Sequence, residues 1–319
     1  MRIFLYECIS AGGLGPDVPD SLRREGGAML AAVVADFRRL RGVEVVTIAD
    51  ETEHGVFEEA AAGCDWTLVI APEFDELLQT RSQAVLDVGG RLLGSHPGAI
   101  GMTADKLALA EYWHARGLPH PLTQGLDPAA IASFPPPWVM KPRFGAGSQA
   151  TFLIRNQDDA MRVWAPAFHE CPNDDFIVQQ YVRGRPASVA LLMGVKETIP
   201  LNPCWQHLSQ DGRFRYRGGS LPMDAALCER AKRLALKAVA GIKGLQGYVG
   251  VDLVLGDDGG DFVIEINPRL TTSYLGLRDL CCDNLAELLL KEVQGEMVPA
   301  PTWADRHVQF GIAPPQTIH

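Results

Sequence analysis

The chain has 319 residues, of which 47% are apolar and 21% charged, and its 39 acidic and 29 basic side chains give a formal net charge of −10. A chain of this length is expected to form two or three domains. The acidic balance argues against a nucleic-acid or membrane-surface partner. No apolar stretch approaches the roughly 20 residues that cross a bilayer, and the first residues do not resemble a signal peptide, so we expect a cytoplasmic protein.

The first hundred residues alternate short β-type runs with helical patterns. The predicted strands are RIFLYECI, VEVVTIA, WTLVIAP and RLLGSH, and helices are expected at 21–40, near Glu58 and at 76–88. This alternation favours βαβ units around a parallel sheet. The glycine-rich turn after the first strand does not fit a dinucleotide-binding GxGxxG motif, because Val18 stands where a small residue is needed.

A helix is predicted from Thr103 to Arg116, with Thr103 or Asp105 as its N-cap. Lys106 in its first turn opposes the helix dipole, which hints at an external anion nearby. Beyond a proline-rich connector at 134–138 the pattern changes to short strands with a few helices. We therefore expect an α+β region with antiparallel pairing, distinct from the first domain.

The most informative segment is GYVGVDLVLGDDGGDFVIEINPR, at residues 247–269. It reads as a hairpin, and with 257–260 as its loop Asp252 lies opposite Glu265, with Asn267 on the same face. Two carboxylates facing each other in an apolar patch repel unless a cation lies between them, and oxygen ligands of this kind suit Mg²⁺. The alternative is a solvent-exposed strand face that carries ordinary polar residues.

A second segment of interest is WVMKPRFGAGSQATFLI, in which Lys141 ends a predicted strand and a glycine-rich turn follows. The free backbone N–H groups of such a turn form a concave anion receptor, and Lys141 and Arg143 add positive charge beside it. The turn is not a Walker A loop, because it lacks the GK[ST] ending and a following helix. The alternative is a flexible hairpin turn with a solvated lysine.

The order of these features resembles the ATP-grasp superfamily of carboxylate–amine ligases. A lysine opens a helix, a second lysine precedes a glycine-rich hairpin, QQYV ends before Arg183-Gly184, and D…E-x-N follows on a late hairpin. The resemblance covers about residues 100–290. It implies a mixed α/β and α+β fold: an N-terminal Rossmann-like pre-ATP-grasp domain at 1–99, a small lid subdomain at 100–182, and a C-terminal subdomain with the metal site at 183–319.

The resemblance also implies ATP and two Mg²⁺ ions, or Mn²⁺, as cofactors. Glu265 is expected to bridge the two ions, and Pro186 stands where the family often has a glutamate for the ribose hydroxyls. The implied metal ligands are Asp252, Glu265 and Asn267. The implied ATP contacts come from the two lysines, the lid turn and the adenine hinge, that is, Lys106, Lys141, Gly145, Ala146, Gly147, Ser148, Gln179, Gln180, Tyr181 and Val182.

An enzyme of this family is an ADP-forming C–N ligase. A substrate carboxylate attacks the γ-phosphate, and an amine then displaces phosphate from the acyl phosphate. Arg269 is expected to stabilise the transferring phosphoryl group or the tetrahedral oxyanion. Arg217 is the candidate clamp for a substrate carboxylate, on a strand whose alternating arginines otherwise form a solvated edge.

Three short segments, FLYECISAGG, YRGG and NPRLTTSYLGL, are similar to family members that join the γ-carboxylate of glutamate to an aromatic amine such as tyramine or tyrosine, as in methanofuran-type cofactor biosynthesis. The expected partners are therefore an amino acid and an amine, with a homodimer as a further expectation. A phosphotransferase of the same fold and a non-catalytic nucleotide-binding regulator are the alternatives. The implied substrate residues, with Tyr274 as a wall for the aromatic ring, are Glu7, Gly12, Gly13, Thr271, Thr272, Ser273 and Tyr274.

Overall fold

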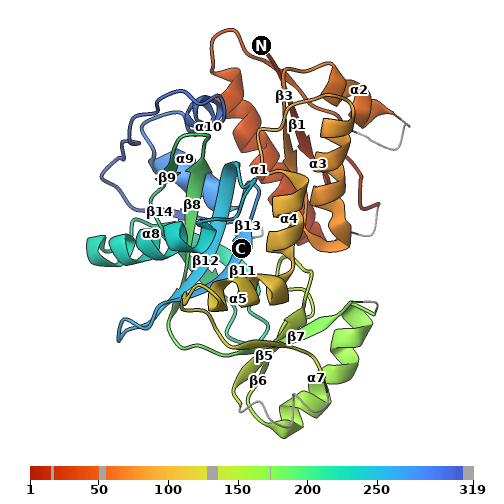
Figure 1. The fold of residues 1–319 in the computed structure, drawn as a ribbon, viewed down its shortest axis with the longest axis vertical. Helices are drawn as coiled ribbons and strands as arrows, with labels where there is room; N and C mark the ends of the chain where they lie inside the picture. Colours follow the sequence, from red (N-terminus) through yellow and green to blue (C-terminus); the bar gives the residue numbers. More distant parts are fainter. Residues whose placement is uncertain (16–17, 50–54, 128–135, 173, 312–319) are drawn as a thin grey trace, which may run out of the picture.

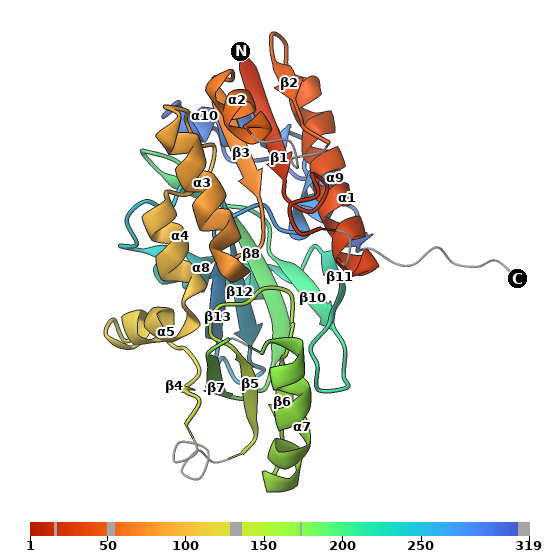
Figure 2. The same ribbon diagram turned by 90° about the vertical axis from the view of Figure 1, so that its right-hand side faces the viewer.

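The computed structural model has its strands in three sheets, with the helices packed around them (Figures 1 and 2). It describes residues 1–15, 18–49, 55–127, 136–172 and 174–311. No helix within these ranges has the length and apolar character needed to cross a membrane.

The first sheet is parallel and belongs to the N-terminal part of the chain. Its central strand β1 (Arg2–Glu7) pairs with β2 (Glu44–Val46) on one side and with β3 (Trp66–Ile70) on the other. The predicted βαβ arrangement is confirmed. RLLGSH, however, contributes only an isolated parallel bridge between Leu92 and Thr67.

Helices cover both faces of this sheet, close to the predicted positions. α1 (Asp20–Arg38) lies on one face, and α2 (Val56–Ala62) and α3 (Leu77–Asp87), with the short 3-10 helix η1 (Phe74–Glu76) before it, lie on the other. Because side chains alternate along a strand, Ile3 and Leu5 face α1 while Phe4 and Tyr6 face α2 and α3.

The helix predicted at 103–116 corresponds to α5 (Lys106–His114), and a separate helix, α4 (Pro97–Ala104), precedes it. α4 ends just before Asp105, whose backbone is extended, and α5 begins directly after it. The carboxylate of Asp105 accepts hydrogen bonds from the backbone N–H groups of Leu107 and Ala108, so Asp105 is the N-cap and Lys106 is the first helical residue.

The second sheet has four antiparallel strands and one helix. Its strands, in spatial order, are β4 (Thr123–Gly125), β7 (Phe176–Gln180), β5 (Trp138–Pro142) and β6 (Phe152–Ile154). α7 (Gln157–Glu170) covers the face that carries Trp138, Met140 and Val178. By alternation, Val139 and Lys141 of β5 and Gln179 of β7 lie on the uncovered face.

The third sheet is the largest. Its strand order is β13 (Phe262–Asn267), β12 (Gly247–Leu255), β8 (Arg185–Met193), β10 (Cys204–Leu208), β11 (Tyr216–Leu221) and β14 (Val308–Phe310), and β9 (Thr198–Pro200) pairs with β8. α8 (Ala225–Val239) packs on one face, while α9 (Ser273–Leu280), α10 (Leu285–Val293) and α1 pack on the other. The antiparallel pairing expected beyond the connector is confirmed.

A buried ionic cluster joins the N-terminal helix α1 to α9. Asp36 on α1 is 3% exposed, and its carboxylate accepts hydrogen bonds from the hydroxyl of Tyr274, at 2.7 Å, and from Nε and Nη2 of Arg278, at 2.8 and 2.7 Å. The backbone carbonyl of Asp36 also accepts a bond from the side-chain amide of Asn284. Charge-assisted bonds of this kind are short and strong, so they position the first sheet against the third.

We expect Asp36→Asn to lower the free energy of unfolding by about 2–4 kcal/mol, because it leaves the half-buried guanidinium of Arg278 without its counter-charge. Tyr274→Phe, which removes one hydrogen bond and keeps the ion pair, should cost about 1–2 kcal/mol. Urea unfolding of both variants measures the difference. Equal losses would mean that the ion pair adds nothing beyond a single hydrogen bond.

Candidate active site

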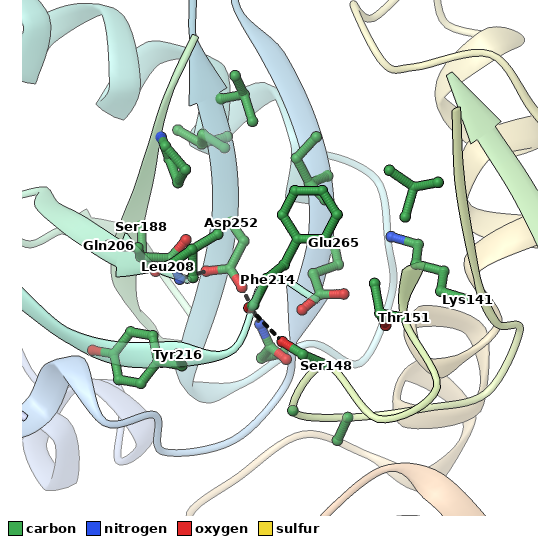
Figure 3. A pocket seen from close by; sticks show the side chains of 18 of the residues that line it. Lys141, Ser148, Thr151, Ser188, Gln206, Leu208, Phe214, Tyr216, Asp252 and Glu265 are labelled. Carbon is green, nitrogen blue, oxygen red and sulfur yellow. Dashed lines mark hydrogen bonds between the residues drawn. The ribbon is translucent and has the colours of Figure 1, made fainter. Parts of the chain in front are cut away.

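A cavity of about 300 Å³ lies between the second and third sheets. The uncovered face of the second sheet contributes Val139, Lys141 and Gln179 to its wall, and the third sheet contributes Asp252 and Glu265. Figure 3 shows Lys141 projecting from one side of the cavity towards Glu265 on the other. Two segments that the sequence singled out, each far from the other in the chain, therefore form one site.

The β12–β13 hairpin holds the acidic side of the cavity in the predicted register. Asp252 is paired directly with Glu265, and Gly250 with Asn267. Nearer the turn the prediction is wrong, because Leu253 pairs with Val263 and Ile264 is left as a bulge. Such a bulge strengthens the local twist of the strand without changing the face that Asp252 and Glu265 share.

Two amide side chains hold the carboxylate of Asp252 in place. Asn267 donates from Nδ2 to Oδ2 at 3.2 Å, and Gln206 of β10 donates from Nε2 to Oδ1 at 2.9 Å. Burial, followed by repulsion from Glu265, raises the pKa of Asp252 to about 7. Burial also opposes ionisation of Glu265, but the nearby ammonium groups of Lys106 and Lys141 hold its pKa below the ordinary value.

This arrangement fits a hard divalent cation. Two facing carboxylates that cannot both ionise at low cost, beside an amide oxygen, form a donor set that a cation would neutralise. In the described ranges, no group of three or more histidine, cysteine, aspartate or glutamate side chains is placed to hold a metal ion. Two carboxylates and an amide oxygen suit Mg²⁺, which accepts one or two carboxylates and completes its octahedron with phosphate and water oxygens.

Both predicted phosphate-contacting lysines line the cavity and are less than a tenth exposed. Burial lowers the pKa of Lys141 to about 8, with Glu265 acting in the opposite direction. The ammonium group of Lys106 donates to the carbonyl oxygen of Gly145 at 2.6 Å, which connects α5 to the glycine-rich turn. The two lysines place positive charge beside this turn.

Arg143 does not add free positive charge there, contrary to expectation. Its guanidinium donates to both carboxylate oxygens of Asp105, at 2.8 and 2.6 Å. Burial opposes the charge on Asp105, but the bonds from Arg143 and from the α5 backbone lower its pKa below the ordinary value. Asp105 thus caps α5 and fixes the end of β5 at once, which sets the positions of Lys106 and Lys141.

The glycine-rich turn at 145–148 forms one edge of the cavity, and all of its residues line it. Gly147 and Ser148 both have positive φ, at 69° and 65°, so the turn is tightly curved. The hydroxyl of Ser148 donates to the backbone carbonyl of Phe214 at 2.7 Å, a bond drawn in Figure 3. This bond joins the turn to the loop before β11 and holds the two sheets together over the cavity.

The segment proposed as a hinge, Gln179 to Val182, also lines the cavity. It leaves β7 after Gln180, and the backbone N–H of Tyr181 donates to the carbonyl of Pro137. The side-chain amide of Gln179 donates to the hydroxyl of Thr123 on β4 at 3.0 Å. Gly184 and Pro186 follow Val182 along the cavity wall. Pro186 therefore supplies no carboxylate at the position where the family often has a glutamate for the ribose hydroxyls.

The far end of the cavity is lined by Thr271, Thr272 and Ser273, which follow β13. Arg269 lines it too, but its guanidinium is paired with Glu73 from the N-terminal part of the chain. The distances are 2.8 Å between Nε and Oε1 and 2.9 Å between Nη2 and Oε2. Glu73 is buried and the side chain of Arg269 is 15% exposed, so the charge of Arg269 is largely balanced within the protein.

Five predicted residues do not line the cavity. Tyr274 is buried and donates to Asp36, so it forms no wall for an aromatic ring. Arg217 is exposed, because β11 begins at Tyr216, which takes the cavity side and leaves Arg217 on the opposite one. Gly12 and Gly13 lie in the turn after β1, and Glu7 ends β1, where its carboxylate accepts hydrogen bonds from the backbone N–H groups of Ile9 and Ser10.

Sequence reasoning missed several residues that line the cavity. They come from strands and helices whose neighbours are distant in sequence, so no local pattern indicates them. Gln206 is the clearest case, because its role depends on β10 pairing with β8 beside β12. The others include Glu25, Thr151, Ser188, Phe214 and Tyr216.

Comparison with known proteins shows the same organisation. A family model described as an ATP-grasp domain matches residues 103–273, and one described as a pre ATP-grasp 3 domain matches residues 30–100. A solved structure of an ATP-grasp superfamily protein from Archaeoglobus fulgidus superposes with a TM-score of 0.74 at 24% identity, covering 98% of this chain and all of that one. That likeness concerns the fold.

Two curated relatives share more of the sequence. The tyramine–L-glutamate ligase of Methanocaldococcus fervens is 27% identical over 270 residues, which are 82% of this chain and 78% of the relative. The enzyme of the same name from Methanocaldococcus jannaschii is 30% identical over 237 residues, which are 73% of this chain and 64% of the relative. The chain thus spans a little under two thirds of the second relative.

We expect Mn²⁺ to raise the thermal unfolding midpoint of the protein in the presence of ADP, and Asp252→Asn to remove most of that rise, because a charged ligand is lost. The measurement is the difference in midpoint between ADP with Mn²⁺ and ADP with EDTA. Asp257→Asn, an exposed change on the same hairpin, is the matched control and should behave as the wild type does. An unchanged rise in Asp252→Asn would contradict the metal assignment.

Proposed function

Because the chain belongs to the ATP-grasp family of carboxylate–amine ligases, we propose that it joins an amino acid to an amine in an ATP-dependent, ADP-forming reaction. The finer form of the proposal is that the γ-carboxylate of L-glutamate is activated and an aromatic amine, tyramine or tyrosine, receives it. The observation that carries the proposal is the facing pair Asp252 and Glu265 across one cavity from Lys106 and Lys141.

ATP is proposed to lie between the two sheets. Its adenine would pack in the apolar part of the cavity near Val139 and the hinge at 179–182, where backbone groups reach the ring edge. Its phosphates would extend towards Lys106 and Lys141, under the turn at 145–148. Two buried ammonium groups beside a glycine-rich turn favour a polyanion over a neutral ligand.

Asp252, Glu265 and Asn267 are the residues proposed to hold Mg²⁺. When bound, Mg²⁺ supplies charge neutralisation to the β- and γ-phosphates. Gln206 and the amide of Asn267 orient the carboxylate of Asp252 in advance, since both donate to it in the structure. Fixing the ligands before binding reduces the reorganisation that binding requires.

The proposed reaction has two steps. A carboxylate oxygen of the amino acid attacks the γ-phosphorus, the bond to the β,γ-bridging oxygen breaks, and ADP leaves as an acyl phosphate forms. The amine nitrogen then attacks the acyl carbon, the bond from the acyl carbon to the phosphate oxygen breaks, phosphate leaves, and the amine loses its proton to phosphate or solvent. Lys141 and Lys106 stabilise negative charge on the phosphates in the first step. The turn at 145–148 excludes water from the acyl phosphate.

The substrate end is proposed to lie at Thr271, Thr272 and Ser273, because these line the cavity beyond the carboxylate pair. The aromatic amine is suggested by the two tyramine–L-glutamate ligase relatives. Tyr274 is buried against Asp36 and does not contact this part of the cavity. Phe214 and Tyr216 do line the cavity, and we propose that they contact the ring of the aromatic amine.

We expect ADP release to depend on both an amino acid and an amine. A panel of amino acids assayed with ATP and Mg²⁺, with and without tyramine, tyrosine and other amines, measures this, and mass spectrometry identifies the amide. ADP release with one substrate and a phosphorylated product would instead indicate a phosphotransferase. ATP binding without any turnover on the panel would indicate a nucleotide-binding regulator.

We expect Glu265→Gln to reduce the turnover number by at least about 100-fold, because it removes a negative charge that faces the cation and the phosphates. The shape of β13 is retained, so circular dichroism and the unfolding midpoint should stay close to those of the wild type. Glu229→Gln, an exposed change on α8, is the control. Near-normal activity of Glu265→Gln would refute the assignment of this carboxylate.

A further inference from the structure

One carboxylate in the cavity wall has no part in the reaction described above. Glu25 lies in the second turn of α1, in the N-terminal part of the chain, yet it lines the cavity between the second and third sheets. Figure 2 shows the N-terminal end of α1 reaching down beside β11. Glu25 accepts a short hydrogen bond from the hydroxyl of Thr272, at the proposed substrate end.

The other charges that line the cavity have opposite charges beside them or an assigned role. Arg269 is paired with Glu73, and Lys106 and Lys141 face the carboxylate of Glu265. Among the described residues, no lysine or arginine forms an ion pair with Glu25. Its hydrogen bond to Thr272 is to a neutral hydroxyl, so the carboxylate of Glu25 has no direct cationic partner among the described residues.

Glu25 also lies close to the reacting end of the site. Glu25 lines the same cavity as Glu265 and Arg269. Glu25 comes from α1 and Glu265 from β13, so the two carboxylates reach this cavity from different parts of the fold. A small molecule bound between them would have one end near Glu25 and the other end near Glu265.

The backbone next to Glu25 is held closely. A Cβ atom on Gly26 would lie 2.5 Å from the carboxylate of Glu7, so α1 approaches the turn after β1 as near as a glycine permits. The hydroxyl and backbone N–H of Ser10 both donate to that carboxylate. Glu7 does not line the cavity, but its close packing against Gly26 helps to fix the position of the neighbouring Glu25.

We propose that the carboxylate of Glu25 binds the α-ammonium group of the amino acid whose carboxylate is activated, and so selects amino acids over carboxylic acids that lack the amine. This inference rests on the proposed function of the same site. The hydroxyl of Thr272 holds one oxygen of Glu25, and the other accepts a charge-assisted hydrogen bond from the ligand. A ligand without the ammonium group would leave the carboxylate desolvated and unpaired, which costs affinity.

The competing explanation is structural: Glu25 could serve only to connect α1 to the segment at 271–273 through Thr272. Two variants separate these roles. Glu25→Gln keeps an oxygen that accepts the bond from Thr272 but removes the charge. Thr272→Val removes the bond but keeps the charge.

The test is calorimetric titration of the full chain, saturated with Mg²⁺ and a non-hydrolysable ATP analogue, with L-glutamate and with glutarate, which lacks only the amino group. We expect the wild type to bind glutamate at least about tenfold more tightly than glutarate. Glu25→Gln should bind the two with similar affinity. In Thr272→Val both affinities should change together, so that their ratio stays that of the wild type.

Equal binding of glutamate and glutarate by the wild type would overturn the inference, as would a wild-type ratio in Glu25→Gln. Loss of the ratio in Thr272→Val would show that Glu25 acts only through its bond to Thr272. Failure of the ligase proposal is seen separately, as the absence of ADP release by the wild type on the substrate panel.

Discussion

The repulsion between Asp252 and Glu265 is the constraint around which the site is built. Adjacent strands bring these two carboxylates together, and neither burial nor the apolar strands around them lowers the cost of charging both. Amides from Asn267 and Gln206 hold one of them, and the two lysines favour ionisation of the other. The site is therefore electrostatically incomplete by itself, and it is completed by the cation and the phosphates that it is proposed to bind.

The second sheet meets this requirement from the opposite side. Its covered face packs against α7, so its other face is available for Lys141 and for the hinge. Asp105 links the end of β5 to the start of α5, and through that link both lysines are held against the same turn. One partly buried aspartate, Asp105, thus helps to position both Lys106 and Lys141, which are 35 positions apart in the chain.

The parts of the site that could be predicted from sequence are those with a local cause. The opposition of Asp252 and Glu265 follows from one short hairpin, and the cap at Asp105 follows from its place before Lys106. The bulge at Ile264 was not predictable, because nothing in the turn residues requires it. Gln206 and Glu25 were missed because strand order and helix docking, not spacing, bring them to the cavity. The prediction that Arg217 faces the substrate is not met, because the side that a residue faces along β11 depends on which residue begins the strand, and β11 begins at Tyr216.

The ion pair between Arg269 and Glu73 has a consequence for how this chain can be divided. The segment matched as an ATP-grasp domain contains Arg269 but not its partner Glu73. A fragment cut at that boundary would carry a buried guanidinium without its carboxylate, and its central sheet would lose the cover of α1. Sequence comparison treats the two regions as separate domains. The free energy of unfolding of the ATP-grasp region nevertheless depends on contacts with the region that precedes it. Exchanging first domains between relatives would thus alter the charge balance beside the reacting groups as well as substrate choice.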